Sequence, residues 1–261
     1  MAAFPNYRSP KWLKKKMVPP ELQSGERLDS LGVCGWRIIQ SEAAFRFSID
    51  AVLLAFFATV RPQDRAVDLG AGTGAVAMLL LSRGIRSVTG LDSNAELVAL
   101  ATRSAACNGL SEQVRYLYGD VKDIRAILPA GDCELVVTNP PFRLPDSGRI
   151  SPVEAVARAR HETTAGLQDF VSAAAFLLCH RGRLAMVHLP ERLADVCIAL
   201  RSTGLEPKRM RFVHPFADRP AKLVLVEAVK GVKAGLAVLP PLAIYQAPGK
   251  YNPEILAYYS G

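Results

Sequence analysis

Apolar positions along the middle of the chain change repeatedly between two spacings, and this change predicts alternating strands and helices. Short apolar runs that end at Gly, Asp or Asn are typical of strands buried on both faces of a sheet. Longer segments with apolar residues at helical spacing lie between them. The predicted strands are residues 66–69, 87–92, 114–118, 134–138, 183–188, 210–213 and 222–227, and the predicted helices are 45–60 with a Ser48 cap, 75–83, 94–108, 167–179 and 191–202.

This alternation predicts an α/β fold in which helices cover both faces of a mostly parallel sheet. The last two strands are expected to close the sheet as a hairpin. Residues 1–46 are different, because they are polar, basic and rich in turn signals. We therefore expect a basic N-terminal extension over residues 1–46, followed by one domain over residues 47–261.

A glycine-rich turn follows the first predicted strand and has the pattern Asp68-x-Gly70-x-Gly72-x-Gly74. Glycine allows a tight turn and a close approach of the backbone to a ligand, because it has no Cβ. Sites for dinucleotides favour G-x-G-x-x-G, whereas here every second residue is Gly and an acidic residue precedes the first. The spacing favours S-adenosylmethionine over a nicotinamide dinucleotide.

Two acidic residues end the next predicted strands. Asp92 lies about twenty residues beyond the glycines, where a carboxylate can accept hydrogen bonds from ribose hydroxyls. Asp120 ends the third strand, where it can accept a hydrogen bond from an adenine amine, although an Asp there is also a common helix cap. Ligands of open α/β sheets bind beyond the carboxyl ends of the strands, so we expect both residues in the cofactor site.

The tetrapeptide Asn139-Pro140-Pro141-Phe142 follows the fourth predicted strand. An aromatic amine is a poor nucleophile, because its lone pair is delocalised into the ring. The Asn139 side-chain oxygen and the Pro140 carbonyl can accept from the two N–H groups of the amine and localise that lone pair. The two prolines stiffen the turn, and Phe142 can stack on a base taken out of its helix or loop. These residues predict methyl transfer to a planar nitrogen, without need of a general base.

Composition and charge extend this prediction to the substrate. The formal net charge of +8 favours an anionic partner, for which nucleic acid is the first candidate. The five cysteines are widely spaced and form no C-x-x-C pair, which suits a reducing compartment. Neither they nor the four histidines have a metal-ligand spacing, and no apolar run is long enough to span a membrane. We expect a cytoplasmic protein.

Together these motifs resemble class I S-adenosylmethionine-dependent methyltransferases, and in particular the bacterial tRNA(Val)-type adenine-N6 methyltransferase family. Further segments similar to that family are Phe45–Ala55, Arg160–Glu162, Pro190–Leu193 and Leu205–Arg209. The resemblance implies a Rossmann-like, seven-stranded sheet and methylation of an adenine beside the anticodon of a tRNA. It also implies that Asn139–Phe142 hold the base, and that Asp50, Gly70, Asp92 and Asp120 line the cofactor site.

Basic residues outside these motifs are candidates for holding RNA. The long connection after the catalytic turn carries several arginines, and long loops in such places are often functional. A lysine run near the N-terminus can grip phosphates, although such runs and loops are often merely solvated. The candidate RNA-binding residues are Lys14, Lys15, Lys16, Arg143, Arg149 and Arg160.

Several alternative functions stay open at this point. Many adenine-acting members have Tyr where this chain has Phe142, and Asn-Pro-Pro-Phe also occurs in guanine-amine methyltransferases of ribosomal RNA. A protein-glutamine methyltransferase has an amide target that suits the same turn. A catalytically silent module that binds S-adenosylmethionine or RNA is the alternative from another class, and the presence of Asn139 disfavours it.

Overall fold

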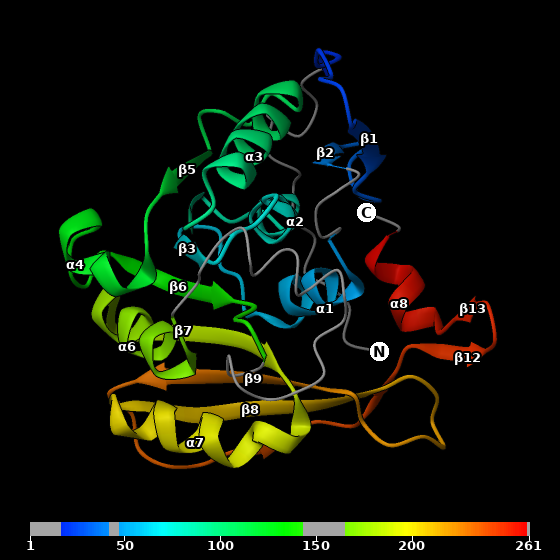
Figure 1. The fold of residues 1–261 in the computed structure, drawn as a ribbon. Coiled ribbons are helices and arrows are strands. Elements are labelled where there is room, and N and C mark those ends of the chain that lie inside the picture. Colours follow the sequence, from blue (N-terminus) through cyan, green and yellow to red (C-terminus); the bar gives the residue numbers. More distant parts are fainter. Residues whose placement is uncertain (1–16, 42–46, 143–164, 260–261) are drawn as a thin grey trace.

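A mixed, mostly parallel sheet forms the centre of the molecule (Figure 1). The computed structural model describes residues 17–41, 47–142 and 165–259. The main strands are β3 (Arg65–Leu69), β4 (Ser87–Asp92), β5 (Val114–Tyr118), β6 (Cys133–Thr138), β7 (Leu178–His188), β8 (Leu205–His214) and β9 (Leu223–Lys230). Their order is β8-β9-β7-β6-β3-β4-β5, and only the pairs of β9 with β7 and β8 are antiparallel. The predicted parallel sheet and its closing hairpin are confirmed.

Helices cover both faces of this sheet, as predicted (Figure 1). One face carries α1 (Ile49–Phe57), α2 (Ala75–Ser82) and α3 (Ala95–Cys107), and the other carries α4 (Ile124–Ile127), α6 (Leu167–Leu177) and α7 (Leu193–Ser202). Strand β6 shows why three consecutive residues at its centre are apolar. Leu135 and Val137 belong to the core on the first face, while Val136 belongs to the core on the second.

Side-chain caps fix the start of two helices near the carboxyl ends of the strands. The Ser48 hydroxyl accepts a hydrogen bond from the Asp50 amide at 3.3 Å, which confirms the predicted cap of α1. The Asn94 side chain accepts from the amides of Glu96 and Leu97 at 2.9 and 3.3 Å, which caps α3. These local bonds set where each helix begins, so polar residues written in the sequence decide the helix boundaries.

An N-terminal hairpin that the sequence analysis did not predict packs on α3 (Figure 1). It consists of β1 (Glu26–Ser30) and β2 (Arg37–Ser41) in antiparallel pairing. The outer edge of β2 is paired with helix side chains. The Asn108 amide accepts from the Arg37 N–H at 2.9 Å and donates to its carbonyl at 2.6 Å, and the Ser104 hydroxyl accepts from the Ile39 N–H at 2.9 Å. Residues 42–46, where the predicted domain boundary lies, are outside the described residues.

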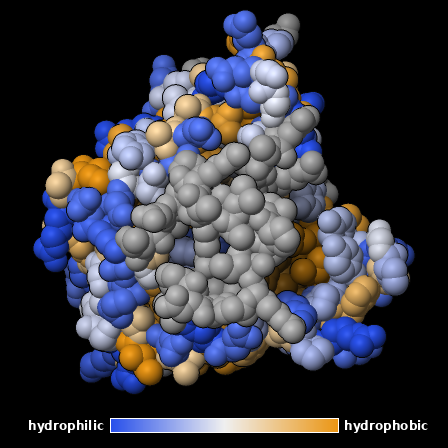
Figure 2. All heavy atoms as spheres, in the orientation of Figure 1, coloured by the Kyte–Doolittle hydropathy of each residue, from blue (hydrophilic) through white to orange (hydrophobic). Residues whose placement is uncertain are grey.

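The C-terminal segment was also not predicted to form regular structure. Two-residue strands β10 (Ala237–Val238) and β11 (Leu242–Ala243) pair with β8 and extend the sheet beyond the seven expected strands. The segment then forms the hairpin of β12 (Tyr245–Ala247) and β13 (Lys250–Tyr251), followed by α8 (Pro253–Tyr258). The Tyr258 ring stacks on Phe56 of α1 with centroids 4.5 Å apart. Apolar atoms show at the inner side of this C-terminal unit in Figure 2, while hydrophilic side chains dominate the margins of that face.

The predicted boundaries are wrong at β7, which begins earlier than expected. Helix α6 ends at Leu177, and Leu178 already belongs to β7, five residues before the predicted start at Arg183. Short 3-10 turns η2 (Val121–Asp123) and η3 (Pro190–Arg192) precede α4 and α7. Across the described ranges, no helix is long and apolar enough to cross a membrane.

Candidate functional site

Three parallel strands bring the predicted motifs to one edge of the sheet. The glycine turn follows β3, Asp92 ends β4, and Asn139 follows β6. Since the strands are parallel, their carboxyl ends lie side by side. Residues separated by some seventy positions in the sequence therefore share one site.

The glycine turn runs in left-handed backbone conformations. The φ angles of Gly70, Gly72 and Gly74 are 75°, 54° and 85°. A Cβ on Gly74 would lie 2.4 Å from the Tyr116 hydroxyl oxygen, so any other residue at this position would have to displace the Tyr116 side chain. A Cβ on Gly72 would meet no described atom within 4 Å, so the turn is open there. The sequence therefore provides one glycine for close packing and one for ligand approach.

The Asp92 carboxylate links the glycine turn to the start of α3. Its Oδ2 accepts a hydrogen bond from the Gly72 amide at 2.7 Å, and its Oδ1 accepts from the Asn94 amide at 2.9 Å. A carboxylate can accept from several donors at once, so these two bonds are compatible with a further one from a ligand hydroxyl. The structure thus places Asp92 where the sequence predicted it, against the glycines.

Asp68 is the most deeply buried acidic group at this edge. Its side chain is 1% exposed, and Oδ2 has no hydrogen-bond partner among the residues that the structure describes. Burial, with a further contribution from the neighbouring Asp92 charge, raises the pKa of Asp68 to about 7, although the Ala77 N–H opposes the shift. Two adjacent carboxylates disfavour a pyrophosphate and favour a cationic ligand. The acidic pair therefore favours S-adenosylmethionine over a nicotinamide dinucleotide, as the glycine spacing does.

The two remaining acidic candidates have different surroundings. Asp50 lies half-buried in the first turn of α1, and burial raises the pKa of its carboxyl. The adjacent Phe47 amide donates to the buried Gln40 side chain at 2.8 Å, which ties this turn to the N-terminal hairpin. Asp120 accepts from the Lys122 amide at 2.9 Å and caps η2. A capping role is thus evident for Asp120, while a ligand contact of either residue stays a prediction.

The Asn-Pro-Pro-Phe turn is fixed beside the glycine turn by the preceding residue. The buried Thr138 hydroxyl donates to the Leu69 carbonyl at 2.9 Å, which joins the ends of β6 and β3. Asn139 and Phe142 are half-buried and Pro140 is buried, while Pro141 is exposed. The strand ends therefore hold a polar amide and an aromatic ring next to the turn that Gly72 opens.

One residue at this edge was missed by the sequence analysis. His188 ends β7 and is fully buried, and its ring lies 5.4 Å from the Phe142 ring, between centroids, at an interplanar angle of 60°. A single His after an apolar run carries no motif. Its position at a strand end, where the other site residues lie, was the available signal.

The predicted RNA-binding residues lie outside the part of the chain that the structure describes. They are Lys14, Lys15, Lys16, Arg143, Arg149 and Arg160. Their role stays a prediction from the sequence.

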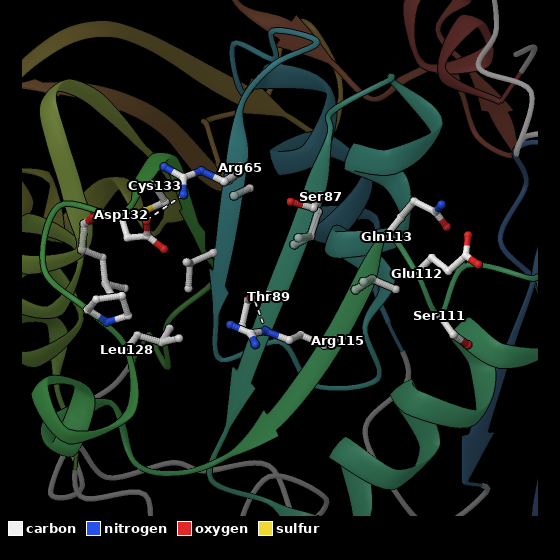
Figure 3. Close-up of a pocket in the computed structure, with 16 residues that line it drawn as sticks. Arg65, Ser87, Thr89, Ser111, Glu112, Gln113, Arg115, Leu128, Asp132 and Cys133 are labelled. Carbon is white, nitrogen blue, oxygen red and sulfur yellow. Dashed lines mark hydrogen bonds and ion pairs between the residues drawn. The ribbon is translucent and has the colours of Figure 1, made fainter.

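A cavity of about 260 Å³ lies at the opposite edge of the sheet (Figure 3). Its lining includes Arg65, Ser87 and Cys133, which begin β3, β4 and β6. Arg65 is engaged there by Asp132 at 2.6 Å, and the Arg115 side chain donates to Thr89 at 3.2 Å. Because this cavity lies at the amino ends of the strands, it contributes no group to the site described above.

Comparison with known sequences matches this chain to methyltransferases. The methyltransferase small domain family matches residues 48–193. A tRNA1(Val) (adenine(37)-N6)-methyltransferase of Porphyromonas gingivalis is 28% identical over 247 residues, which make up 91% of this chain and 92% of the relative. A protein of the same name from Tolumonas auensis is 26% identical, over 85% of this chain and 91% of the relative.

Solved structures give the same fold. A predicted O-methyltransferase, protein Atu636 from Agrobacterium tumefaciens, superposes with a TM-score of 0.65 at 25% identity, over 80% of this chain and 95% of that chain. Geranyl diphosphate C-methyltransferase from Streptomyces coelicolor, in complex with S-adenosyl-L-homocysteine, superposes with a TM-score of 0.51 at 16% identity, over 69% of this chain and 76% of that chain. The second likeness concerns the fold alone.

Proposed function

This chain belongs to the methyltransferase small domain family, and from that premise we propose that it methylates the N6 amine of an adenine in tRNA. S-adenosylmethionine is the methyl donor, and it supplies a methyl group on a sulfonium that a nucleophile can attack. The relatives that match most of this chain are named for adenine 37 of tRNA1(Val). We propose the same position, beside the anticodon, for this chain.

The site fits a methyl donor that carries positive charge. Asp68 and Asp92 place two carboxyl groups beside the open Gly72 turn, so a sulfonium and an ammonium find compensating charge there. The Asp92 carboxylate at the end of β4 is the proposed acceptor for ribose hydroxyls, and Asp120 follows the neighbouring β5. Asp50 at the start of α1 completes the proposed cofactor residues, together with Gly70 and Gly74.

The observation that carries the proposal is the Asn-Pro-Pro-Phe turn held at the end of β6 by the bond from Thr138 to Leu69. This turn offers two fixed acceptors, the Asn139 side-chain oxygen and the Pro140 carbonyl, for the two N–H groups of an amine. Accepting both hydrogens draws the nitrogen toward tetrahedral geometry and directs its lone pair. The transfer then depends on positioning, because the attack needs only a near-attack geometry.

The number of hydrogens on the nucleophile separates nitrogen from oxygen targets. A hydroxyl has one hydrogen and a free lone pair, so it gains nothing from two acceptors and requires a base instead. An exocyclic amine has two hydrogens and a delocalised pair, which suits the acceptor pair of Asn139 and Pro140. The turn therefore supports an N-methyltransferase, whatever the target of the Agrobacterium protein.

The partner proposed for this site is RNA. A net charge of +8 suits a polyanion, and Phe142 provides a ring on which an unstacked base can lie. We propose that the lysine run at residues 14–16 and the arginines of residues 143–160 hold the phosphates. Since tRNA modification takes place in the cytoplasm, we propose that location for this protein.

The experiment is methyl transfer from labelled S-adenosylmethionine to separate pools of total tRNA, ribosomal RNA and release factor. Label should enter tRNA as N6-methyladenosine, located at position 37 by mass spectrometry of nuclease fragments. Label in ribosomal RNA guanine or in a glutamine would support one of the two alternative substrates, and label in none would support a silent binding module.

The catalytic assignment is tested with Asn139→Ala. This variant should lose at least about 100-fold in kcat while its affinity for S-adenosylmethionine stays within twofold, because the lost acceptor acts on the base. Asn252→Ala, which removes the side-chain cap of α8 and changes no proposed site residue, is the control and should keep full activity. Transfer by Asn139→Ala at the wild-type rate would refute the role of the acceptor pair.

A further inference from the structure

A buried histidine borders the Asn-Pro-Pro-Phe turn and has no role in the methyl-transfer step derived above. His188 ends β7, two residues beyond Met186, and Met186 pairs with Thr138 at the end of β6, directly before the Asn-Pro-Pro-Phe turn. The residue is 0% exposed. Its ring is in edge contact with Phe142, the proposed stacking platform. The imidazole therefore lies within the walls of the proposed base site.

The hydrogen bonds of this ring determine where its proton lies. The Leu189 amide donates to Nδ1 at 2.8 Å, so Nδ1 is an acceptor and carries no hydrogen. Burial lowers the pKa of His188 to about 4, so the ring is neutral at physiological pH and holds one proton. That proton is on Nε2. The side chain thus presents a single N–H donor of fixed direction.

The Nε2 donor is buried without an acceptor among the residues that the structure describes. A buried polar group that lacks a partner destabilises the fold, and such groups are uncommon in native proteins. An apolar side chain at this position would avoid that penalty and would still pack against Phe142. The unpartnered donor is therefore best explained by an acceptor that arrives with the substrate.

We propose that the His188 Nε2–H donates to the ring nitrogen beside the target amine and so selects adenine. This inference rests on the proposed function. The N6 amine of adenine is flanked by N1 and N7, which are both acceptors. The N2 amine of guanine is flanked by N3, an acceptor, and by N1, which carries a hydrogen. A fixed donor on the N1 side pairs with adenine and meets the N1–H of a guanine bound in the same orientation. A donor on the N7 side finds no nitrogen at the same position in guanine, because guanine N3 is bonded to the carbon that carries the amine and adenine N7 is not.

The proposal is tested with tRNA transcripts that carry 1-deazaadenosine or 7-deazaadenosine at the target position. Each analogue is expected to lower the kcat/KM of the wild-type protein relative to unmodified tRNA. One of the two should lower it about tenfold more than the other, as expected for one missing hydrogen bond. Equal losses of kcat/KM with the two analogues would overturn the inference. This experiment uses the wild-type protein alone.

Two variants then separate the donor from the ring. His188→Asn retains an acceptor for the Leu189 amide but has no donor at the Nε2 position, whereas His188→Gln places an amide nitrogen there. Both lose the aromatic contact with Phe142, so that loss cancels between them. The analogue penalty should disappear in His188→Asn and persist in His188→Gln. Because each analogue also alters the amine, only the penalties within each variant are compared.

Two results would contradict the base-reading role. One is the same analogue penalty in His188→Asn as in the wild type, and the other is identical behaviour of the Asn and Gln variants. A wild-type protein that methylates no tRNA adenine would overturn the proposed function and this inference with it. Normal activity on unmodified tRNA without any analogue effect would overturn the inference alone.

Discussion

Replacing Asp68 by Asn should weaken the binding of S-adenosylmethionine and remove its dependence on pH. In the free protein, burial raises the pKa of the Asp68 carboxyl to about 7, so it is about half protonated at neutral pH. A cationic ligand beside it favours the ionised form and lowers that pKa in the complex. Binding therefore releases a proton below pH 7, and affinity rises as the pH is raised toward 7.

The size of the effect follows from proton linkage. If the bound carboxyl stays ionised, Kd is multiplied by the ratio of total to ionised Asp68 in the free protein. Between pH 7.5 and 5.5 that ratio changes by about 25-fold for a pKa of about 7. About 0.9 proton should be released on binding at pH 6. His188 does not titrate in this window, since burial lowers its pKa to about 4.

Isothermal titration calorimetry in buffers of different ionisation enthalpy measures both quantities. Asp68→Asn keeps an acceptor for the Ala77 N–H, so it should fold, bind at least about 25-fold more weakly than the wild type at pH 7.5, and show the same Kd at pH 5.5 as at pH 7.5. Asp132→Asn is the control, because Asp132 pairs with Arg65 at the far edge of the sheet. A wild-type Kd that is constant across the window, or an unchanged pH dependence in Asp68→Asn, would refute the reasoning.

Two further predictions concern the scaffold around the site. Gly74→Ala should destabilise the protein by more than the about 1–2 kcal/mol of a left-handed Ala, because its Cβ would lie 2.4 Å from the Tyr116 hydroxyl oxygen. Gly204→Ala is the control, because Gly204 has a φ of 76° and no described atom within 4 Å of its added Cβ, so this variant measures the backbone contribution alone. Equal losses of stability in the two variants, measured by thermal unfolding, would disprove the clash. Asn108→Ala should cost about 1–3 kcal/mol in chemical denaturation, since it leaves two backbone groups of Arg37 unpaired. A loss below about 0.5 kcal/mol would mean that water replaces this contact.

The amino-acid sequence by itself determined the fold class and the main residues of the candidate site. Apolar strands and capped helices are local patterns, so β3 to β6 and α1 to α3 were predicted close to their observed bounds. The glycine turn, Asp92 and the Asn139 turn were found because a motif depends on residue type and spacing. Parallel pairing then required that these strand ends meet, which the structure confirms.

Only the tertiary structure decided the features that depend on partners distant in sequence. The N-terminal hairpin exists because Asn108 and Ser104 of α3 satisfy the edge of β2, and no pattern within residues 26–41 encodes those partners. Burial beside Asp92 changes the ionisation of Asp68, which in the sequence is an ordinary carboxyl group. His188 becomes a donor of fixed direction through its neighbours in space. Burial and electrostatic environment arise when strands come together, so they could not be obtained from the order of residues alone.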